Sequence, residues 1–243
     1  MGGQYLMKFF SKITIKSKLM LTYIILIIIP TLVNGFFIYK QLLESFANKS
    51  FVLIEQRLKH EVENIKNDLQ NIEMLGYRMS SSTTIIDFLN QIPKYSIADF
   101  HKNYNYKISP IFSYFLNTNS GVSNINILVS DPKVPEVSVF IRTEEFTQEP
   151  WFQNVKSSVH IGSPYWEGYH PSRNYRNVDS KNRHVYSLFF EINTYGSSSP
   201  AYLELEINAK KLFSALSASP IGKNGFLAAI TEEGDIISGG NNN

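Results

Sequence analysis

The feature that most constrains this chain is a stretch without any formal charge, Leu19 to Tyr39. As a helix, with about 1.5 Å of rise per residue, it would be roughly 31 Å long, close to the ~30 Å hydrocarbon core of a bilayer. Only helices and closed barrels satisfy their backbone groups in lipid. The stretch therefore predicts one transmembrane helix over 19–39. Pro30 in its middle predicts a kink, which membrane helices tolerate.

Two other interpretations of this stretch are a cleaved signal peptide and a buried core helix. A signal peptide has an apolar region of about 7–15 residues and a small-residue cleavage site. The nearest such pattern, 45–47, lies beyond Lys40. A core helix would show a polar stripe, whereas here only Thr22, Thr31 and Asn34 are polar. A retained membrane anchor fits the pattern better than either.

Basic residues gather before the apolar stretch: Lys8, Lys12, Lys16 and Lys18. The positive-inside rule then places the tail, residues 1–18, in the cytoplasm and the chain from about residue 40 outside the cell. Without these four lysines the net charge of +2 becomes about −2, so nothing indicates a nucleic-acid partner. The chain has no cysteine, which excludes disulfides and thiolate metal sites.

The segment after the anchor, 40–79, has the period of a packed or coiled helix. Its apolar residues recur at an average spacing near 3.5, which predicts a long extracellular stalk helix. The stripe packs against its own domain, against a second copy in a homodimer, or against each in different segments. A Ser/Thr run at 80–83 predicts a break. The residues of the stripe are Phe51, Leu58, Val62, Ile65, Leu69, Ile72 and Met79.

Residues 80–220 predict an α+β domain. Two strongly patterned strands near its end read as a hairpin at the centre of an antiparallel sheet. A last hairpin, 225–238, has its turn at Glu233-Gly234 and begins a further subdomain, 221–243, that the chain does not finish. The other predicted elements are a helix over 100–116, strands at 125–130 and 137–142, a short helix from Pro150, an aromatic strand or loop at 165–169, a basic loop at 170–183, the two strands 184–192 and 201–207, and a helix over 209–217.

This order of parts resembles the sensor region of bacterial histidine kinases of the YesM type, with an extracellular Cache domain in its double form. The resemblance implies a PAS-like antiparallel sheet on a long N-terminal helix. It also implies a second membrane span and a kinase core beyond Asn243. The matching residues are Trp151-Phe152, Tyr165-Trp166, the strand end Phe189-Phe190-Glu191, the strand Tyr202 to Ile207 with the helix Lys210-Lys211-Leu212, and the hairpin Gly225 to Ile237.

The resemblance further implies a small-ligand site in the membrane-distal subdomain, 80–220. Aromatic faces would bury apolar parts of a ligand, and an arginine fork would hold a carboxylate. Core packing is the alternative role for the Trp and Tyr residues, and a solvated loop is the alternative for Arg173 and Arg176. The candidate ligand-binding residues are Trp151, Tyr165, Trp166, Tyr169, Arg173 and Tyr186.

An amino-acid ligand is not implied. Amino-acid-binding domains of the family carry an arginine two residues before a Trp-Tyr pair, and this chain has Glu149 and Phe152 at those places. The five histidines have no metal-ligand spacing, and neither a catalytic motif nor a phosphate loop occurs. We therefore expect no enzyme activity, metal or cofactor in this chain, although a full-length parent would be a protein-histidine kinase.

The sequence thus favours the extracellular ligand-sensing region of a two-component sensor histidine kinase, anchored in a bacterial cell membrane. Its expected partners are the membrane, a small ligand or a solute-binding protein, and a second copy of the chain. A chemotaxis receptor or a membrane-bound transcriptional regulator has the same architecture. A surface-anchored structural protein without a ligand is the alternative from another class.

Overall fold

The computed structural model describes residues 14–119, 121–137, 139–173, 175, 183–194, 200–217 and 227–239. The chain divides into two units, 1–59 and 60–243. Most of the predicted basic tail, most of the predicted loop 170–183 and the first residues of the predicted final subdomain lie outside the described residues.

Helix α2 (Ile15–Ser80) contains the apolar stretch. Within it, the described residues hold one helical segment long and apolar enough, by length and composition, to cross a membrane, and none of that segment is buried. The hydroxyls of Thr22 and Thr31 donate to the carbonyls of Lys18 and Ile27, at 2.8 and 2.7 Å, so these polar groups are satisfied within the helix. This composition is what a lipid-facing helix requires.

The predicted stalk stripe divides into two parts. Phe51, Leu58 and Val62 are exposed. Ile65 and Leu69 pack against the domain core, while Ile72 and Met79 are buried in it. The second part of the stripe is therefore a core contact of the chain's own domain, and the first part has no such contact among the described residues.

A short helical run follows the end of α2 at Ser80. Its elements are α3 (Thr83–Gln91), the 3-10 turn η1 (Ile92–Lys94), α4 (Ile97–Asn103), the π-helical segment η2 (Tyr104–Ile108) and α5 (Ser109–Thr118). The predicted break at 80–83 is confirmed. The single helix predicted over 100–116 is instead three segments, because Pro110 begins a new helical turn and the π segment precedes it.

A five-stranded sheet forms the centre of the domain, in the order β2-β1-β5-β4-β3. Four strands are antiparallel neighbours, as predicted, and β4 and β5 pair at the middle. The edge strand β2 departs from the predicted antiparallel arrangement, because it runs parallel to β1. After β1 the chain first returns toward the start of that strand and then reverses direction again, so that Phe140 pairs with Ile127. The strands are β1 (Val122–Val129), β2 (Phe140–Arg142), β3 (Tyr165–Pro171), β4 (His184–Ile192) and β5 (Ala201–Asn208).

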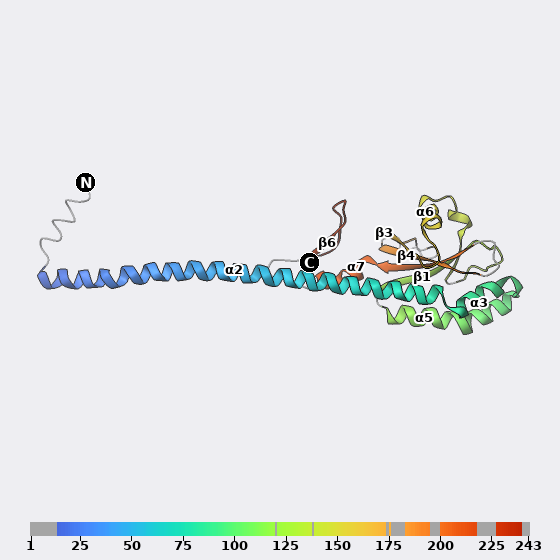
Figure 1. The fold of residues 1–243 in the computed structure, drawn as a ribbon, viewed down its shortest axis with the longest axis horizontal. Helices are drawn as coiled ribbons and strands as arrows, with labels where there is room; N and C mark the ends of the chain where they lie inside the picture. Colours follow the sequence, from blue (N-terminus) through green and yellow to red (C-terminus); the bar gives the residue numbers. More distant parts are fainter. Residues whose placement is uncertain are drawn as a thin grey trace. The chain divides into compact units, whose positions relative to one another are not determined.

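The sheet has a packed layer on each face. The end of α2, with α3 and α5, covers one face, and α6 (Pro150–Ser158) covers the other (Figure 1). Successive side chains of β4 and β5 point to opposite faces of the sheet and so contribute to both layers. Leu188, Leu203 and Leu205 join the core beneath the helices. Phe189 and Tyr202 pack with α6. A 3-10 turn, η3 (Thr143–Phe146), precedes α6.

Beyond β5 the chain forms α7 (Ala209–Leu212), α8 (Ser214–Ser217) and a hairpin of β6 (Ala228–Ile230) and β7 (Ile236–Gly239). The predicted hairpin is confirmed. Gly234 has a φ of 98°, a left-handed conformation that favours glycine, which explains the turn at this position.

Candidate functional site

Acidic side chains are buried in the middle of the sheet, on the face that α6 covers. Glu204 and Glu206 alternate along β5 with Leu203 and Leu205, so both carboxylates point away from the helical core. Their residues are 0% and 2% exposed. Glutamate is seldom buried unless it is paired, so this arrangement indicates a specialised polar site.

Four donors surround the Glu204 carboxylate. Asn126 Nδ2 donates to it at 2.9 Å, Ser187 Oγ at 3.1 Å, Tyr175 Oη at 3.3 Å and an Arg173 guanidinium nitrogen at 3.3 Å. Burial raises the pKa of Glu204, and the neighbouring Glu206 raises it further, although Arg173 acts in the opposite direction. The carboxylate is thus well bonded but remains costly to ionise.

Glu206 is held mainly by the segment that follows β3. Ser172 Oγ donates to both carboxylate oxygens at 3.1 Å, and the Arg173 backbone N–H donates at 3.3 Å. Burial raises the pKa of Glu206, and these hydrogen bonds offset only part of the increase. Two neighbouring carboxylates with raised pKa values therefore share one buried region.

Arg173 is the cation of this region. Its guanidinium pairs with Glu167 and with Glu204, and it lies 3.6 Å from the centroid of the Trp151 ring. Burial lowers the pKa of Arg173, but the hydrogen bond to Glu167 and the charges of Glu167 and Glu204 outweigh burial, so the pKa is raised. The side chain stays charged and is fixed between carboxylates and an aromatic face.

Glu167 and His170 complete the set, which we call the charged cluster: Glu167, His170, Arg173, Glu204 and Glu206. His170 Nε2 hydrogen-bonds Ser187 Oγ at 3.1 Å. Burial, and then the charge of Arg173, lower the pKa of His170, which favours its neutral form. Glu167 Oε2 is buried without a hydrogen bond to any described residue, although His170 Nε2 lies 3.5 Å away.

A bulge in β3 brings Glu167 and His170 to the same face. The pairing with β4 shifts between these two residues, so they share a face although they are three positions apart. Tyr169 is left toward the other face, where its ring stacks on that of His184 at 4.7 Å and 11°. In a regular strand, Tyr169 would share the face of Glu167, and His170 would lie on the opposite face.

Aromatic rings surround the charged cluster. The ring of Trp151 packs on Phe146 and Phe189, and Phe146 also packs on Tyr175. Such rings exclude water and thereby strengthen the electrostatic interactions beside them. The described aromatic residues of this layer are Phe146, Trp151, Phe152, Tyr165, Tyr175, Phe189 and Tyr202.

The structure brings together only part of the predicted ligand set. Trp151, Tyr165 and Arg173 lie on the charged-cluster face. Trp166 and Tyr186 pack against the core beneath the helices, and Tyr169 contacts Tyr186 on that side. The six predicted residues therefore do not form a single site. Arg173 is also far from solvated, with its side chain 14% exposed.

Sequence reasoning missed the acidic half of the cluster. The sequence predicted a strand at 201–207, but it did not identify Glu204 and Glu206 within that strand as candidate site residues. A signal was present, because Ser187 and Asn126 occupy the same face of the two neighbouring strands, but only the strand register reveals it. Among the described residues no group of three or more His, Asp and Glu side chains is placed to hold a metal ion.

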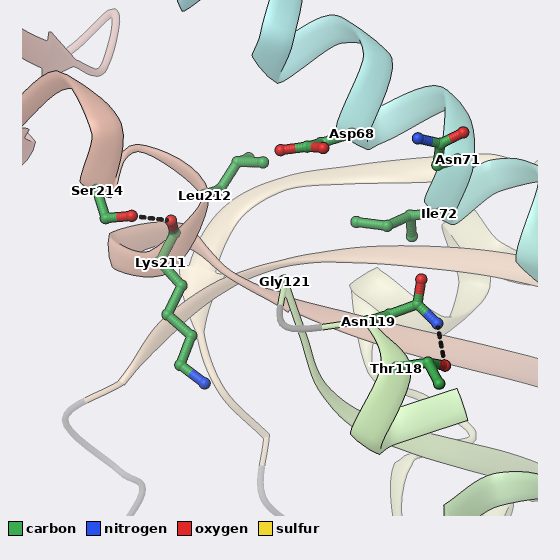
Figure 2. Close-up of a pocket in the computed structure, with 9 residues that line it drawn as sticks. All are labelled: Asp68, Asn71, Ile72, Thr118, Asn119, Gly121, Lys211, Leu212 and Ser214. Atoms are coloured by element: carbon green, nitrogen blue, oxygen red, sulfur yellow. Dashed lines mark hydrogen bonds between the residues drawn. The ribbon is translucent and has the colours of Figure 1, made fainter. Parts of the chain in front are cut away.

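A separate cleft of about 460 Å³ lies on the helical side, where α2, the end of α5 and α7 meet (Figure 2). Asp68 and Asn71 line it from α2, and Lys211 from α7. Figure 2 shows the Lys211 side chain extending away from Asp68. At least one hydroxyl group in the lining of this cleft already has a hydrogen-bond partner within the protein, since Ser214 Oγ donates to the Lys211 carbonyl at 2.7 Å.

The fold is similar to that of a solved extracellular domain. The extracellular domain of vpHK1S-Z8, described as a histidine kinase, superposes with a TM-score of 0.50 at 15% identity, covering 68% of this chain. This chain spans 59% of the length of that domain. The mixed helix-and-sheet fold predicted from the sequence is thereby confirmed.

Two other solved structures are more distant. A domain of a sensory box/GGDEF family protein from Vibrio parahaemolyticus has a TM-score of 0.48 at 15% identity, covering 72% of this chain and 69% of its own. The sensory domain of the Campylobacter jejuni chemoreceptor Tlp3, with isoleucine bound, has a TM-score of 0.38 at 14% identity, with 78% and 73% covered. No protein-family model and no curated protein matches the sequence.

Proposed function

We propose that this chain is the ligand-sensing part of a membrane-anchored receptor, and that its ligand binds at the charged cluster. The apolar part of α2 anchors the chain, and the lysines before it orient the domain from residue 60 onward outside the cell. The receptor is a sensor histidine kinase of the YesM type whose output domain follows the described part of the chain. The fold shared with a histidine-kinase extracellular domain supports this proposal.

The observation that carries the proposal is the buried oxygen Glu167 Oε2, which lacks a hydrogen bond to any described residue. A buried carboxylate oxygen without a donor costs free energy, and a ligand that supplies the donor recovers it. The oxygen lies in the same cluster as Glu204 and Glu206, two carboxylates whose pKa values are raised mainly by burial. Perturbed groups of this kind gather at functional sites.

The ligand therefore carries a positive charge. Among the described residues of the charged cluster, three carboxylates face one guanidinium, and burial lowers the pKa of His170, which favours its neutral form. A ligand ammonium group would donate to Glu167 Oε2 and offset the excess negative charge. Trp151 and Tyr165 beside it suit the apolar part of an amine.

The strand β4 offers a route from the site to α2. Phe189 packs on Trp151 and Tyr165 on the ligand side, and Phe190 packs on Tyr77 of α2 on the other side, with ring centroids 5.1 Å apart. A ligand that moves Trp151 would therefore alter how Phe190 packs against α2. The extent to which the ligand shifts this equilibrium is limited by the difference between its affinities for the two packing arrangements of the domain.

A thermal-shift screen of the purified full chain tests the proposal, using amines, carboxylates and neutral sugars at equal concentration. We expect amines alone to raise the melting temperature, since a ligand at 100 times its Kd adds about 2.7 kcal/mol of stability. Glu167→Gln should abolish the shift, whereas the same change at the exposed Glu145 should keep it. Stabilisation by carboxylates rather than amines would overturn the assigned ligand class.

A further inference from the structure

A second cleft lies on the opposite face of the sheet from the charged cluster, beside α7, where β3 and β5 end and β4 begins. It has a volume of about 670 Å³, within the usual range of about 300–1,000 Å³ for small-molecule sites. Tyr169 forms part of its wall, with Tyr186 and Phe213 packed in sequence behind that ring. Tyr186 belongs to the core beneath the helices, so this cleft is separate from the proposed amine site.

The lining of this cleft is basic. Among the described residues that line it, Arg183, Lys210 and Lys211 are cations and none is a carboxylate. None of the three forms an ion pair with another described residue. Lys211 also extends away from Asp68, the acidic residue of the neighbouring cleft (Figure 2). The positive charge of the cleft is therefore not balanced within the described part of the chain.

Ordered backbone holds these cations in place. The Arg183 carbonyl accepts a hydrogen bond from the Ser172 N–H at 2.7 Å, which extends the pairing of β3 and β4 by one position. The side chain of Asn208 caps α7 by accepting from the Lys211 N–H at 3.0 Å. The arginine thus approaches the cleft from the residue before β4, and the two lysines approach it from α7.

We propose that this basic cleft, defined by Tyr169, Arg183, His184, Lys210 and Lys211, binds a phosphate ester. A guanidinium fork and two ammonium groups match the several oxygens and the charge of a phosphate. The stacked rings of Tyr169 and His184 provide a flat wall for the organic part. The volume exceeds what an inorganic phosphate fills, which leaves room for that part. A soluble sugar phosphate and the headgroup of an anionic lipid share this chemistry.

Isothermal titration of the full chain in detergent tests the proposal, with glucose 6-phosphate, glucose and dihexanoyl phosphatidylglycerol as titrants. We expect binding of at least one phosphate titrant and none of glucose. The double change Lys210→Gln and Lys211→Gln should weaken that binding by about tenfold or more, as expected when charge-assisted hydrogen bonds are lost. The matched control is Lys102→Gln with Lys107→Gln, two exposed lysines on other elements, which should change it less than about twofold.

The two phosphate titrants distinguish the sources. Tighter binding of glucose 6-phosphate supports a soluble ester, and tighter binding of the short-chain lipid supports a headgroup. The proposal is overturned if neither binds, or if the control pair weakens binding as much as the cleft pair does. Glu167→Gln, which removes a group of the amine site, should leave phosphate binding unchanged, so the outcome is independent of the proposed function.

Discussion

Gly76 of α2 lies directly against the ring of Phe190 of β4. A Cβ atom at Gly76 would come within 2.0 Å of Phe190 Cε2, closer than real Cβ contacts occur. Because glycine has no side chain, α2 can pack closely against the sheet at this point. Phe189, the preceding residue of β4, faces Trp151 on the other side with ring centroids 6.2 Å apart. One strand thus contacts both α2 and the wall of the charged cluster.

The substitution Gly76→Ala should lower the free energy of unfolding by about 1–3 kcal/mol, because the added methyl group overpacks the contact with Phe190. Alanine is the better helix former by about 1 kcal/mol, so helix propensity alone predicts the opposite sign. Urea unfolding of the full chain measures the change. Gly168→Ala is the control, since a Cβ there meets nothing within 4 Å. A more stable Gly76→Ala variant would contradict the close packing.

Arg173→Met should destabilise the domain by about 3–5 kcal/mol near pH 7.5, because it leaves buried carboxylates without their cation. The loss should be smaller at pH 5. Arg173 lowers the pKa of Glu204 and Glu206, so its removal raises both further. Carboxyls with raised pKa values contribute stability that is present at low pH and lost as the pH rises through those values.

Urea unfolding at the two pH values checks this prediction. Arg142→Met is the control, because the Arg142–Glu136 ion pair is 37% and 42% exposed and should contribute less than about 1 kcal/mol at either pH. Equal losses for Arg173→Met at pH 5 and 7.5 would show that the charges of the cluster do not govern its stability.

The membrane orientation can be tested by labelling single cysteines, because the chain has no native cysteine. Ser157→Cys, at an exposed position of α6, should react with a membrane-impermeant maleimide on intact cells. Ser11→Cys, among the N-terminal lysines, should react only after lysis. Labelling in the reverse order would place the domain in the cytoplasm and contradict the anchor's orientation.

The exposed part of the stalk stripe predicts a parallel contact between two copies of α2. A cysteine at Leu58, on the stripe, should form an intermolecular disulfide when membranes are oxidised. A cysteine at the adjacent Lys59, off the stripe, should cross-link much less. Non-reducing electrophoresis compares the two yields. Equal cross-linking at both positions would argue against a specific homodimer.

The elements of the fold that depend on local pattern were predictable. The alternation in β4 and β5 defined two strands and their pairing, and Glu233-Gly234 marked the last turn. The parallel edge strand β2 was not predictable, because nothing near Phe140 in the sequence records that the chain turns back beside β1. The π-helical segment at 104–108 likewise follows from packing rather than from local propensity.

The candidate site was harder to predict from the sequence, because its residues come from different strands and are brought together only by the way these strands pair. Trp151 and Arg173 were candidates because of the family resemblance, and the structure places the Arg173 guanidinium over the Trp151 ring. Glu204 pairs with residues on three other segments, and no spacing in the sequence joins them. The bulge in β3 also gives Tyr169 and His170 the faces opposite to those they would have in a regular strand.

Calorimetric titration at pH 7.5 with the amine that stabilises the full chain most is the most direct test of the central claim, binding at the charged cluster. Glu167→Gln should weaken the affinity by about tenfold or more, and Glu145→Gln should leave it unchanged. The affinity should also weaken as the pH is lowered, because a bound cation favours the ionised forms of Glu204 and Glu206, whose pKa values are raised. Equal affinities in the two variants would contradict the account.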